Sequence, residues 1–433
     1  MTGRNRASSP NIRCRQYLRE QTRLHRLRKQ VDCPQFTSNS AFEFTVDTEC
    51  LLSNISETVV SRHFTIKRSI SPQRKEAKMA KVAPRFPAVD VHTHLRNDGV
   101  KVALDIMDSV GLKVMVNITA GTTTFFKEGL KAFGGRNRRR FAACVMLDFK
   151  GLDAKNWAAR QADGLEAAVK AGAAGLKEVK RLGLDIRLED GRLLAIDDPR
   201  MDVIWERCGQ LGVPFWIHVS DPLAFHKPLH LTNERVVELQ VHPDWYFNKP
   251  GLPSKYQILN ALNRVIKRHP KTKFICVHFG GLPEDPVTVS HWLDEMPNMY
   301  IDLAARFVEM GRHHPEMMRN FFIRHQDRIL YGTDTGVSAD RVMLGVSMPA
   351  DGEFFGRADF KKAFLLPHFE ATYRYLETDD YFITAPSPVQ GTWPLHGISL
   401  PDRVLRKVYA ENALRIIPAL AKTDAAKARR RRR

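Results

Sequence analysis

Short apolar runs alternate with helix-like stretches along most of this chain. Eight apolar runs of strand length occupy residues 86–91, 113–118, 141–147, 173–179, 214–219, 273–277, 299–303 and 328–331. The helix-like stretches are 100–110, 122–133, 156–171, 199–211, 256–269, 287–295, 315–325 and 402–417. Strands that each lead into a helix pair in parallel through right-handed crossovers. The alternation therefore predicts a (β/α)8 barrel, a TIM-type fold.

Two helix ends and one long connection refine this prediction. Asp198 precedes Pro199, which suits an N-cap and first turn, and Gly172 follows the stretch 156–171 as a C-cap. Residues 338–400 follow the eighth strand and are too long for an ordinary loop. On a barrel this insertion emerges on the catalytic face, so we expect a lid or specificity element. A decorative subdomain or a dimer contact is the alternative.

The net charge of +19 is concentrated at the two ends of the chain. Residues 1–85 hold 17 Lys and Arg against 7 Asp and Glu, and residues 421–433 hold seven against one. Residues 86–420 are nearly neutral, with 43 basic against 40 acidic residues. A neutral body without an RRM, KH or zinc-finger pattern argues against specific nucleic-acid binding. Basic ends give nonspecific, salt-sensitive attachment at most.

The composition divides the chain into three parts. Residues 1–78 are rich in Arg, Ser, Thr and Asn, and we expect a disordered basic extension. Residues 79–420 hold the barrel, including the insertion at 338–400. Residues 421–433 end in five arginines and are expected to be a frayed helix end or a solvated basic tail.

The cysteines and the apolar runs bear on location. Six cysteines show no CxxC or framework spacing, and Cys144, Cys208 and Cys276 fall in apolar or helical runs, as buried free thiols do. This pattern suits a reducing compartment, so we expect a cytoplasmic protein. No run reaches 18 apolar residues and no apolar segment opens the chain, so neither a membrane span nor a secretory signal is expected.

Metal-competent side chains stand at the ends of four strand runs. The first run leads into His92 and His94, which share one face if the strand continues, because side chains alternate. One H-x-H triplet is weak support, since 16 histidines predict roughly 0.6 by chance. However, His218, His278 and Asp334 follow the fifth, sixth and eighth runs. These ends converge on one face of a barrel, so the joint pattern predicts a metal site.

The motifs around these residues resemble the amidohydrolase superfamily. The likeness is greatest to the branch containing aminocarboxymuconate-semialdehyde decarboxylase and related "amidohydrolase 2" proteins. It spans residues 86–418 and rests on H-T-H-L at 92–95, W-I-H-V at 216–219, V-H-F-G-G at 277–281, Y-G-T-D at 331–334 and Y-A-E-N-A at 409–413.

The resemblance implies a ligand set and an acid/base residue. It implies that one divalent metal ion, zinc with manganese as the alternative, is bound by His92, His94, His218 and Asp334. It makes His278 the nearby acid/base residue. Asp334 can both bind the metal and accept a proton from activated water.

Two further residues are candidate substrate contacts. Lys177 lies in the fourth run, where binuclear relatives carry a carbamylated lysine that bridges two metals. The branch that fits best binds one metal, which leaves Lys177 a substrate contact or a plain strand-end lysine. Arg306, just beyond the seventh run, can clamp a substrate carboxylate. Structural pairing of Arg306 with an acid is the alternative.

The resemblance implies a metal-dependent hydrolase that acts on a small organic acid, amide, ester or lactone. The alternative is a nonoxidative decarboxylase of a small unsaturated or aromatic carboxylic acid. Both reactions use the same five residues, so the sequence does not decide between them. A barrel without catalysis is disfavoured by the intact ligand set. A homodimer is expected by analogy with relatives, and the partner predicted for the site is a small molecule.

Overall fold

The computed structural model describes residues 82–344 and 364–430. The N-terminal extension predicted for 1–78 and the middle of the insertion, 345–363, lie outside the described residues.

Parallel strands form two connected sheets. The strands are β1 (Ala88–Leu95), β2 (Leu112–Asn117), β3 (Phe141–Ala143), β4 (Val145–Met146), β5 (Leu176–Glu178), β6 (Phe215–Ile217), β7 (Phe274–Cys276), β8 (Met299–Asp302), β9 (Ile329–Leu330) and β10 (Thr335–Val337). One sheet contains β10, β1, β2 and β3 in that order, and the other runs from β4 to β9. Every pair among these strands is parallel.

The two sheets meet at both of their edges. Cys144 separates β3 from β4, and its N–H donates to the carbonyl of Asn117. At the other edge the N–H of Val91 donates to the carbonyl of Tyr331, directly after β9, over 3.0 Å. With β3–β4 and β9–β10 each counted as one interrupted strand, this gives eight strand positions around a barrel. The predicted (β/α)8 fold is confirmed.

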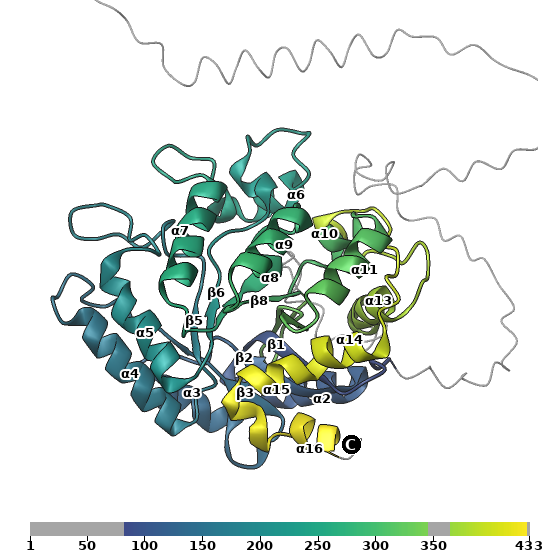
Figure 1. Ribbon diagram of the computed structural model, residues 1–433, viewed down its shortest axis with the longest axis horizontal. Coiled ribbons are helices and arrows are strands. Elements are labelled where there is room, and N and C mark those ends of the chain that lie inside the picture. The colour runs from purple at the N-terminus through teal and green to yellow at the C-terminus, as the bar shows by residue number, and fades with distance from the viewer. Residues whose placement is uncertain (1–81, 345–363, 431–433) are drawn as a thin grey trace, which may run out of the picture. The chain divides into compact units, whose positions relative to one another are not determined.

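Helices lie outside the strands, as Figure 1 shows. They include α2 (Val100–Val110), α3 (Phe126–Phe133), α4 (Trp157–Ala171), α5 (Asp202–Leu211), α7 (Lys255–Arg268), α9 (Pro286–Glu295), α11 (Pro315–Arg324), α14 (Asp402–Arg406) and α15 (Asn412–Ile416). The predicted caps are present. The side chain of Asp198 accepts from the N–H of Arg200, and Gly172 ends α4 with a φ of 111°. Helix α3 begins four residues later than the stretch predicted at 122.

Apolar side chains fill both the barrel and its outer layer. The interior cluster includes Val91, Val114, Ile275 and Leu330. Trp216 also lies inside, where its indole N–H donates to the carbonyl of Val91 over 3.1 Å. This packing holds the strand ends, and hence the site, in fixed positions.

The described part of the insertion is folded. Strand β11 (Val342–Leu344) pairs antiparallel with β10, and α13 (Leu366–Glu377) follows after the gap. A short turn of helix, η9 (Pro388–Gln390), packs against α6 (Val236–Val241) and α10 (Phe307–Gly311).

The fold continues further toward the C-terminus than residue 420. The helix α16 (Asp424–Arg430) packs on β2, Ala425 is buried, and the side chain of Asp424 pairs with Arg139. The first turn of the predicted basic tail is therefore part of the packed structure, because its small residues fit against the strand. None of the helices in the described ranges combines the length and the apolar character needed to cross a membrane.

Candidate metal centre

Strand β1 continues past its predicted end through both histidines of the H-T-H motif. The Nδ1 atom of His92 lies 2.8 Å from Oδ2 of Asp302, at the end of β8. A carboxylate only accepts hydrogen bonds, so Nδ1 carries the proton of the neutral ring and Nε2 presents a lone pair. That Nε2 atom lies 3.4 Å from Oδ1 of Asp334. Two electron-pair donors face each other there, as they do around a bound cation.

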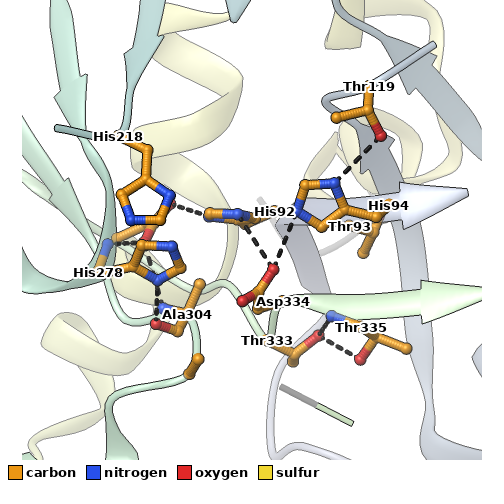
Figure 2. A network of polar contacts seen from close by, with 12 residues as sticks. His92, Thr93, His94, Thr119, His218, His278, Ala304, Thr333, Asp334 and Thr335 are labelled. Carbon is orange, nitrogen blue, oxygen red and sulfur yellow. Dashed lines mark hydrogen bonds and ion pairs between the residues drawn. The ribbon is translucent and has the colours of Figure 1, made fainter. Parts of the chain in front are cut away.

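His94 contacts the same carboxylate from the other side (Figure 2). Its Nε2 lies 3.0 Å from Oδ1 of Asp334, and its Nδ1 lies 3.1 Å from the hydroxyl oxygen of Thr119. The amide oxygen of Asn117 accepts from the N–H groups of Leu95 and Thr119. These bonds hold the end of β1 and the loop after β2 in register with each other.

Asp334 has a left-handed backbone, with φ of 65°. This conformation is uncommon for a residue with a side chain and marks a position held by its surroundings. The holding contacts are close by: the N–H and hydroxyl of Thr333 both donate to the buried carboxyl of Asp90. Burial alone would raise the pKa of Asp334, but the neighbouring rings of His92 and His94 lower it to about 2.

His278 also stands on a strained turn, with φ of 58°. Its Nδ1 donates to the carbonyl of Ala304 over 2.8 Å, and its backbone N–H donates to Oδ1 of Asp302 over 2.8 Å. In the neutral ring this leaves Nε2 as an electron-pair donor. Burial, together with the neighbouring His218 and the charge of Arg306, holds the pKa of His278 well below its ordinary value.

His92, His278 and Asp334 form a grouping that suits a metal ion. Each offers one ligand atom, and these atoms all lie within 4.8 Å of one another. Neutral imidazole nitrogens with an ionised carboxylate are the donors that zinc accepts, and such sets also suit manganese. The residues present therefore fit a divalent ion.

His218, the remaining predicted ligand, lies beside this grouping. Its ring centroid is 4.4 Å from that of His278. Its Nε2 lies 3.1 Å from the carbonyl oxygen of Ser220 and 3.3 Å from Oδ1 of Asp221. Burial lowers the pKa of His218 to about 4, so its ring is neutral at pH 7. The structure thus brings His92, His94 and Asp334 into contact, while the role of His218 as a ligand stays a prediction.

A small pocket of about 170 Å³ opens onto these side chains. Its lining residues are His94, Lys180, His218, Asp221, Phe225, Glu238, Trp245, His278, Arg306, Asp334, Met343 and Gln390. Cavities near 150 Å³ hold a benzene ring, whereas pockets for drug-sized ligands are roughly 300–1,000 Å³. The pocket therefore suits a ligand of about one ring or a short chain.

Positive and negative charges alternate along the pocket wall. The ammonium of Lys180 lies 2.6 Å from Oδ2 of Asp221 and 4.2 Å from the centre of the Trp245 ring. Nη2 of Arg306 lies 3.8 Å from Oδ1 of Asp221, and Nη1 lies 3.7 Å from Oε1 of Glu309. Arg306 thus lines the pocket and pairs with acids, and its contact with a substrate carboxylate stays a prediction.

These cations act on the carboxyl between them. Burial by itself would raise the pKa of Asp221, but Lys180, His218 and Arg306 hold it far below its usual range. Asp221 is therefore ionised under all ordinary conditions and neutralises part of the positive wall.

Lys177 is the middle residue of β5. It is buried, and its ammonium has no hydrogen-bond partner among the described residues. Burial lowers its pKa to about 8, against the attraction of Asp302 and Asp334. Lys177 is not among the residues that line the pocket. Its predicted contact with substrate stays a prediction.

Sequence reasoning did not assign roles to several residues of this site. Asp302 ends β8, which corresponds to the seventh predicted run. Its position at the carboxyl end of a strand is the signal that could have identified it. Lys180 and Asp221 lie two and four residues beyond strand ends, where the same signal is weaker. Trp245 and Gln390 stand in long connections, and no local pattern marks them.

A parallel barrel with metal-competent side chains at the carboxyl ends of its strands defines a class of barrel enzymes with a metal centre. The chain belongs to the amidohydrolase family, whose model matches residues 89–418. The protein is therefore an enzyme of the amidohydrolase superfamily, as the motifs indicated.

Solved structures with a similar fold come from several bacteria. A 2,6-dihydroxybenzoate decarboxylase from Rhizobium is 15% identical, with a TM-score of 0.45 and coverage of 77% of this chain and 99% of that one. A 4-oxalomesaconate hydratase from Rhodopseudomonas palustris is 14% identical, with a TM-score of 0.43 and coverage of 79% of this chain and 99% of that one. A dihydroxybenzoic acid decarboxylase from Polaromonas, with bound manganese and the inhibitor 2-nitroresorcinol, is 14% identical. Its TM-score is 0.39, and the match covers 67% of this chain and 100% of that one.

Proposed function

We propose that the protein is a metal-dependent hydrolase that acts on a small organic acid or its amide, ester or lactone. His92, His94, His218 and Asp334 would hold one divalent ion, zinc or manganese, and His278 would act beside it. Such an ion supplies Lewis-acid activation of water and of a carbonyl group. The family membership, the grouping of His92 and Asp334 with His278, and the contact of His94 with Asp334 support a metal centre at this position.

The observation that carries the proposal is the hydrogen bonding of the two innermost histidines. Asp302 binds Nδ1 of His92, and the carbonyl of Ala304 binds Nδ1 of His278. Both neutral rings therefore keep Nε2 free of a proton. His92 can then bind a cation, and His278 can take a proton from water that attacks the substrate. A residue that takes a proton is what hydrolysis requires first.

The pocket supports a small acid as the substrate. Arg306 and Lys180 place two positive charges on its wall, beside the carboxyl groups of Asp221 and Glu238. A carboxylate of the substrate can pair with the guanidinium of Arg306. The volume of about 170 Å³ excludes polymers and nucleotides.

Decarboxylation is the second candidate reaction, and the aromatic side chains of the pocket favour it. Phe225 and Trp245 line the pocket beside the cations, which suits a planar unsaturated or aromatic carboxylic acid. In that reaction His278 would have to deliver a proton to the carbon that loses CO2.

Metal content tests the centre. In purified full-length protein we expect about one equivalent of zinc or manganese by elemental analysis. His218→Ala should lower this content markedly, whereas His278→Ala should keep the metal and lose activity. His230→Ala is the matched control, because His230 is an exposed loop histidine. Two equivalents would overturn the single-ion proposal and bring back a bridging role for Lys177.

A substrate screen separates the two reactions. Small carboxylates, amides, esters and lactones are incubated with the metal-loaded protein in 18O-labelled water. Hydrolysis places the label in the product carboxylate, whereas decarboxylation releases CO2 in equal amount to the acid consumed. Release of CO2 without label in the organic product would replace the hydrolase proposal by the decarboxylase.

A further inference from the structure

The insertion after the eighth strand contributes two side chains to the pocket. Met343, on β11, and Gln390, at the end of η9, are both lining residues. The described parts of the segment 338–400 therefore form part of the pocket wall. This is the position that a specificity element would take.

Gln390 is buried as a residue, and its carboxamide makes no bond with the described part of the chain. The residue is 2% exposed, and its side chain makes no hydrogen bond with any residue in the ranges 82–344 and 364–430. Its backbone is tied down, because its N–H donates to the carbonyl of Ser387. The carboxamide atoms are not among the fully buried polar atoms that lack a partner, and the residue lines the pocket. A ligand in the pocket that offers a donor or an acceptor can therefore bond with the carboxamide.

The neighbours of Gln390 place it on the same side of the pocket as Arg306. The turn η9 packs against α10, which begins directly after Arg306, and against α6, which carries Glu238. The shortest contact of Arg306 Nη2 with an acid is 3.8 Å, longer than a hydrogen bond. A guanidinium N–H and a carboxamide are thus both available to a ligand on this wall.

We propose that Gln390 is a specificity-determining residue that hydrogen-bonds an oxygen substituent of the substrate. The inference rests on the proposed function, in which a small organic acid reacts at the metal centre. A carboxamide offers two donors and one acceptor, so it can bind a hydroxyl or a carbonyl group. The substrate class is a small acid with a second oxygen group, such as a hydroxy acid or an oxo acid. The same acid without that group leaves the carboxamide unpaired and binds more weakly.

Calorimetric titration of the metal-loaded full chain tests this proposal. The probes are benzoate, 3-hydroxybenzoate and 4-hydroxybenzoate, which differ only in the added hydroxyl. We expect at least one hydroxybenzoate to bind about tenfold more tightly than benzoate. Gln390→Met keeps the length of the side chain but removes its hydrogen bonds, and it should abolish this preference. The affinity for benzoate should change by less than about twofold, since benzoate does not use the carboxamide.

Two further variants serve as controls for the effect of Gln390→Met. Gln390→Glu can still accept a hydrogen bond from a hydroxyl, so it should keep the preference. Gln240→Met makes the same chemical change at an exposed position of α6 and should behave as the parent. If Gln390→Met fails to fold, loss of the preference in a folded Gln390→Glu overturns the proposal.

The outcomes distinguish the proposed role of Gln390 from the proposed function on which it rests. Equal affinity of the parent for all three probes, or the same preference in the parent and in Gln390→Met, overturns the role of Gln390. Metal-dependent binding of benzoate would in that case still support a small-acid enzyme. If none of the probes binds and no small acid, amide, ester or lactone is converted, the proposed function fails, and the role of Gln390 fails with it.

Discussion

Asp302 connects three parts of the candidate metal centre. One carboxylate oxygen contacts Nδ1 of His92, and the other accepts from the backbone N–H groups of His278 and Ala304. Its side chain is completely buried. A single residue therefore orients one ligand ring and also shapes the strained turn that carries a second histidine. Outer partners of this kind typically change metal affinity 10–100-fold when they are removed.

We predict that Asp302→Asn weakens metal binding by about 10–100-fold. The amide that replaces one oxygen can donate to Nδ1 of His92, which moves the ring proton to Nε2 and removes its lone pair. Competition with a chromogenic chelator measures the affinity. Asp379→Asn, at an exposed position of the insertion, is the control and should leave the affinity unchanged. An unaltered affinity in folded Asp302→Asn would contradict the assigned role of Asp302.

Glu178 gives the stability of the fold a predictable dependence on pH. It ends β5 and is buried, and Oε2 has no hydrogen-bond partner among the described residues. Burial raises its pKa from 4.5 to about 8. Between these values the unfolded chain has released the proton that the folded protein keeps. The unfolded state then binds fewer protons, so this residue lowers the stability progressively as the pH rises from about 4.5 to 8.

We therefore predict that Glu178→Gln stabilises the protein at pH 8.5 and has little effect at pH 4.5. The amide resembles the protonated acid and does not ionise, so the expected gain at pH 8.5 is on the order of a few kcal/mol. Urea unfolding of chelator-treated protein at both pH values measures it. Glu189→Gln, at an exposed turn, should show no such difference. A gain of equal size at pH 4.5 would show that ionisation is not the cause.

At the scale of elements, apolar periodicity predicted where the strands and helices lie. The eight predicted runs all contain strands of the barrel, because buried parallel strands read as continuous apolar segments. The boundaries differ from those predicted. Strand β1 extends to Leu95 through polar residues, since pairing with β2 and β10 continues beyond the apolar run.

The site was predictable only where its residues follow strands directly. His92, His94 and Asp334 stand at strand ends, and the structure brings them into contact. By contrast, Trp245 and Gln390 reach the pocket through the packing of connections that are distant in sequence. Such contacts depend on tertiary packing rather than on a local period. The orientation of His218 toward Ser220 and Asp221 depends on side-chain hydrogen bonds that no motif encodes.

A close approach between α3 and a loop yields a prediction at this scale. A Cβ atom at Gly129 would lie 1.7 Å from the carbonyl oxygen of Ala120, which is backbone and cannot move aside cheaply. We predict that Gly129→Ala destabilises the fold by about 1–3 kcal/mol. This is opposite to the gain of about 1 kcal/mol that helix propensity alone would give.

Chemical unfolding measures the effect of Gly129→Ala. Lys131→Ala is the control, because Lys131 is exposed on the same helix, and its stability should stay within about 0.5 kcal/mol of the parent. A displaced loop would also move Thr119, the partner of His94 Nδ1. Weaker metal binding should therefore accompany the loss of stability in Gly129→Ala. A stabilised Gly129→Ala would show that the loop yields easily.

At the scale of the whole molecule, the metal centre joins distant parts of the chain. Its side chains come from β1, the turn after β7 and the end of the eighth strand position. The contacts between them close the barrel where its first and last strands meet. An ion bound there would stabilise the folded state alone, because the unfolded chain does not hold these residues together.

Removal of the metal should therefore lower the thermal stability of the entire barrel. An ion present at 1,000 times its Kd stabilises the folded state by about 4 kcal/mol. We expect the chelated protein to unfold several degrees below the metal-loaded protein, and added zinc or manganese to restore the transition. In Asp334→Ala, which lacks the shared carboxylate, chelation should not shift the transition. The comparison is informative in both directions: an equal shift in Asp334→Ala would place the stabilising ion elsewhere, and the absence of a shift in the metal-loaded parent would mean that the ion does not bind the folded state selectively.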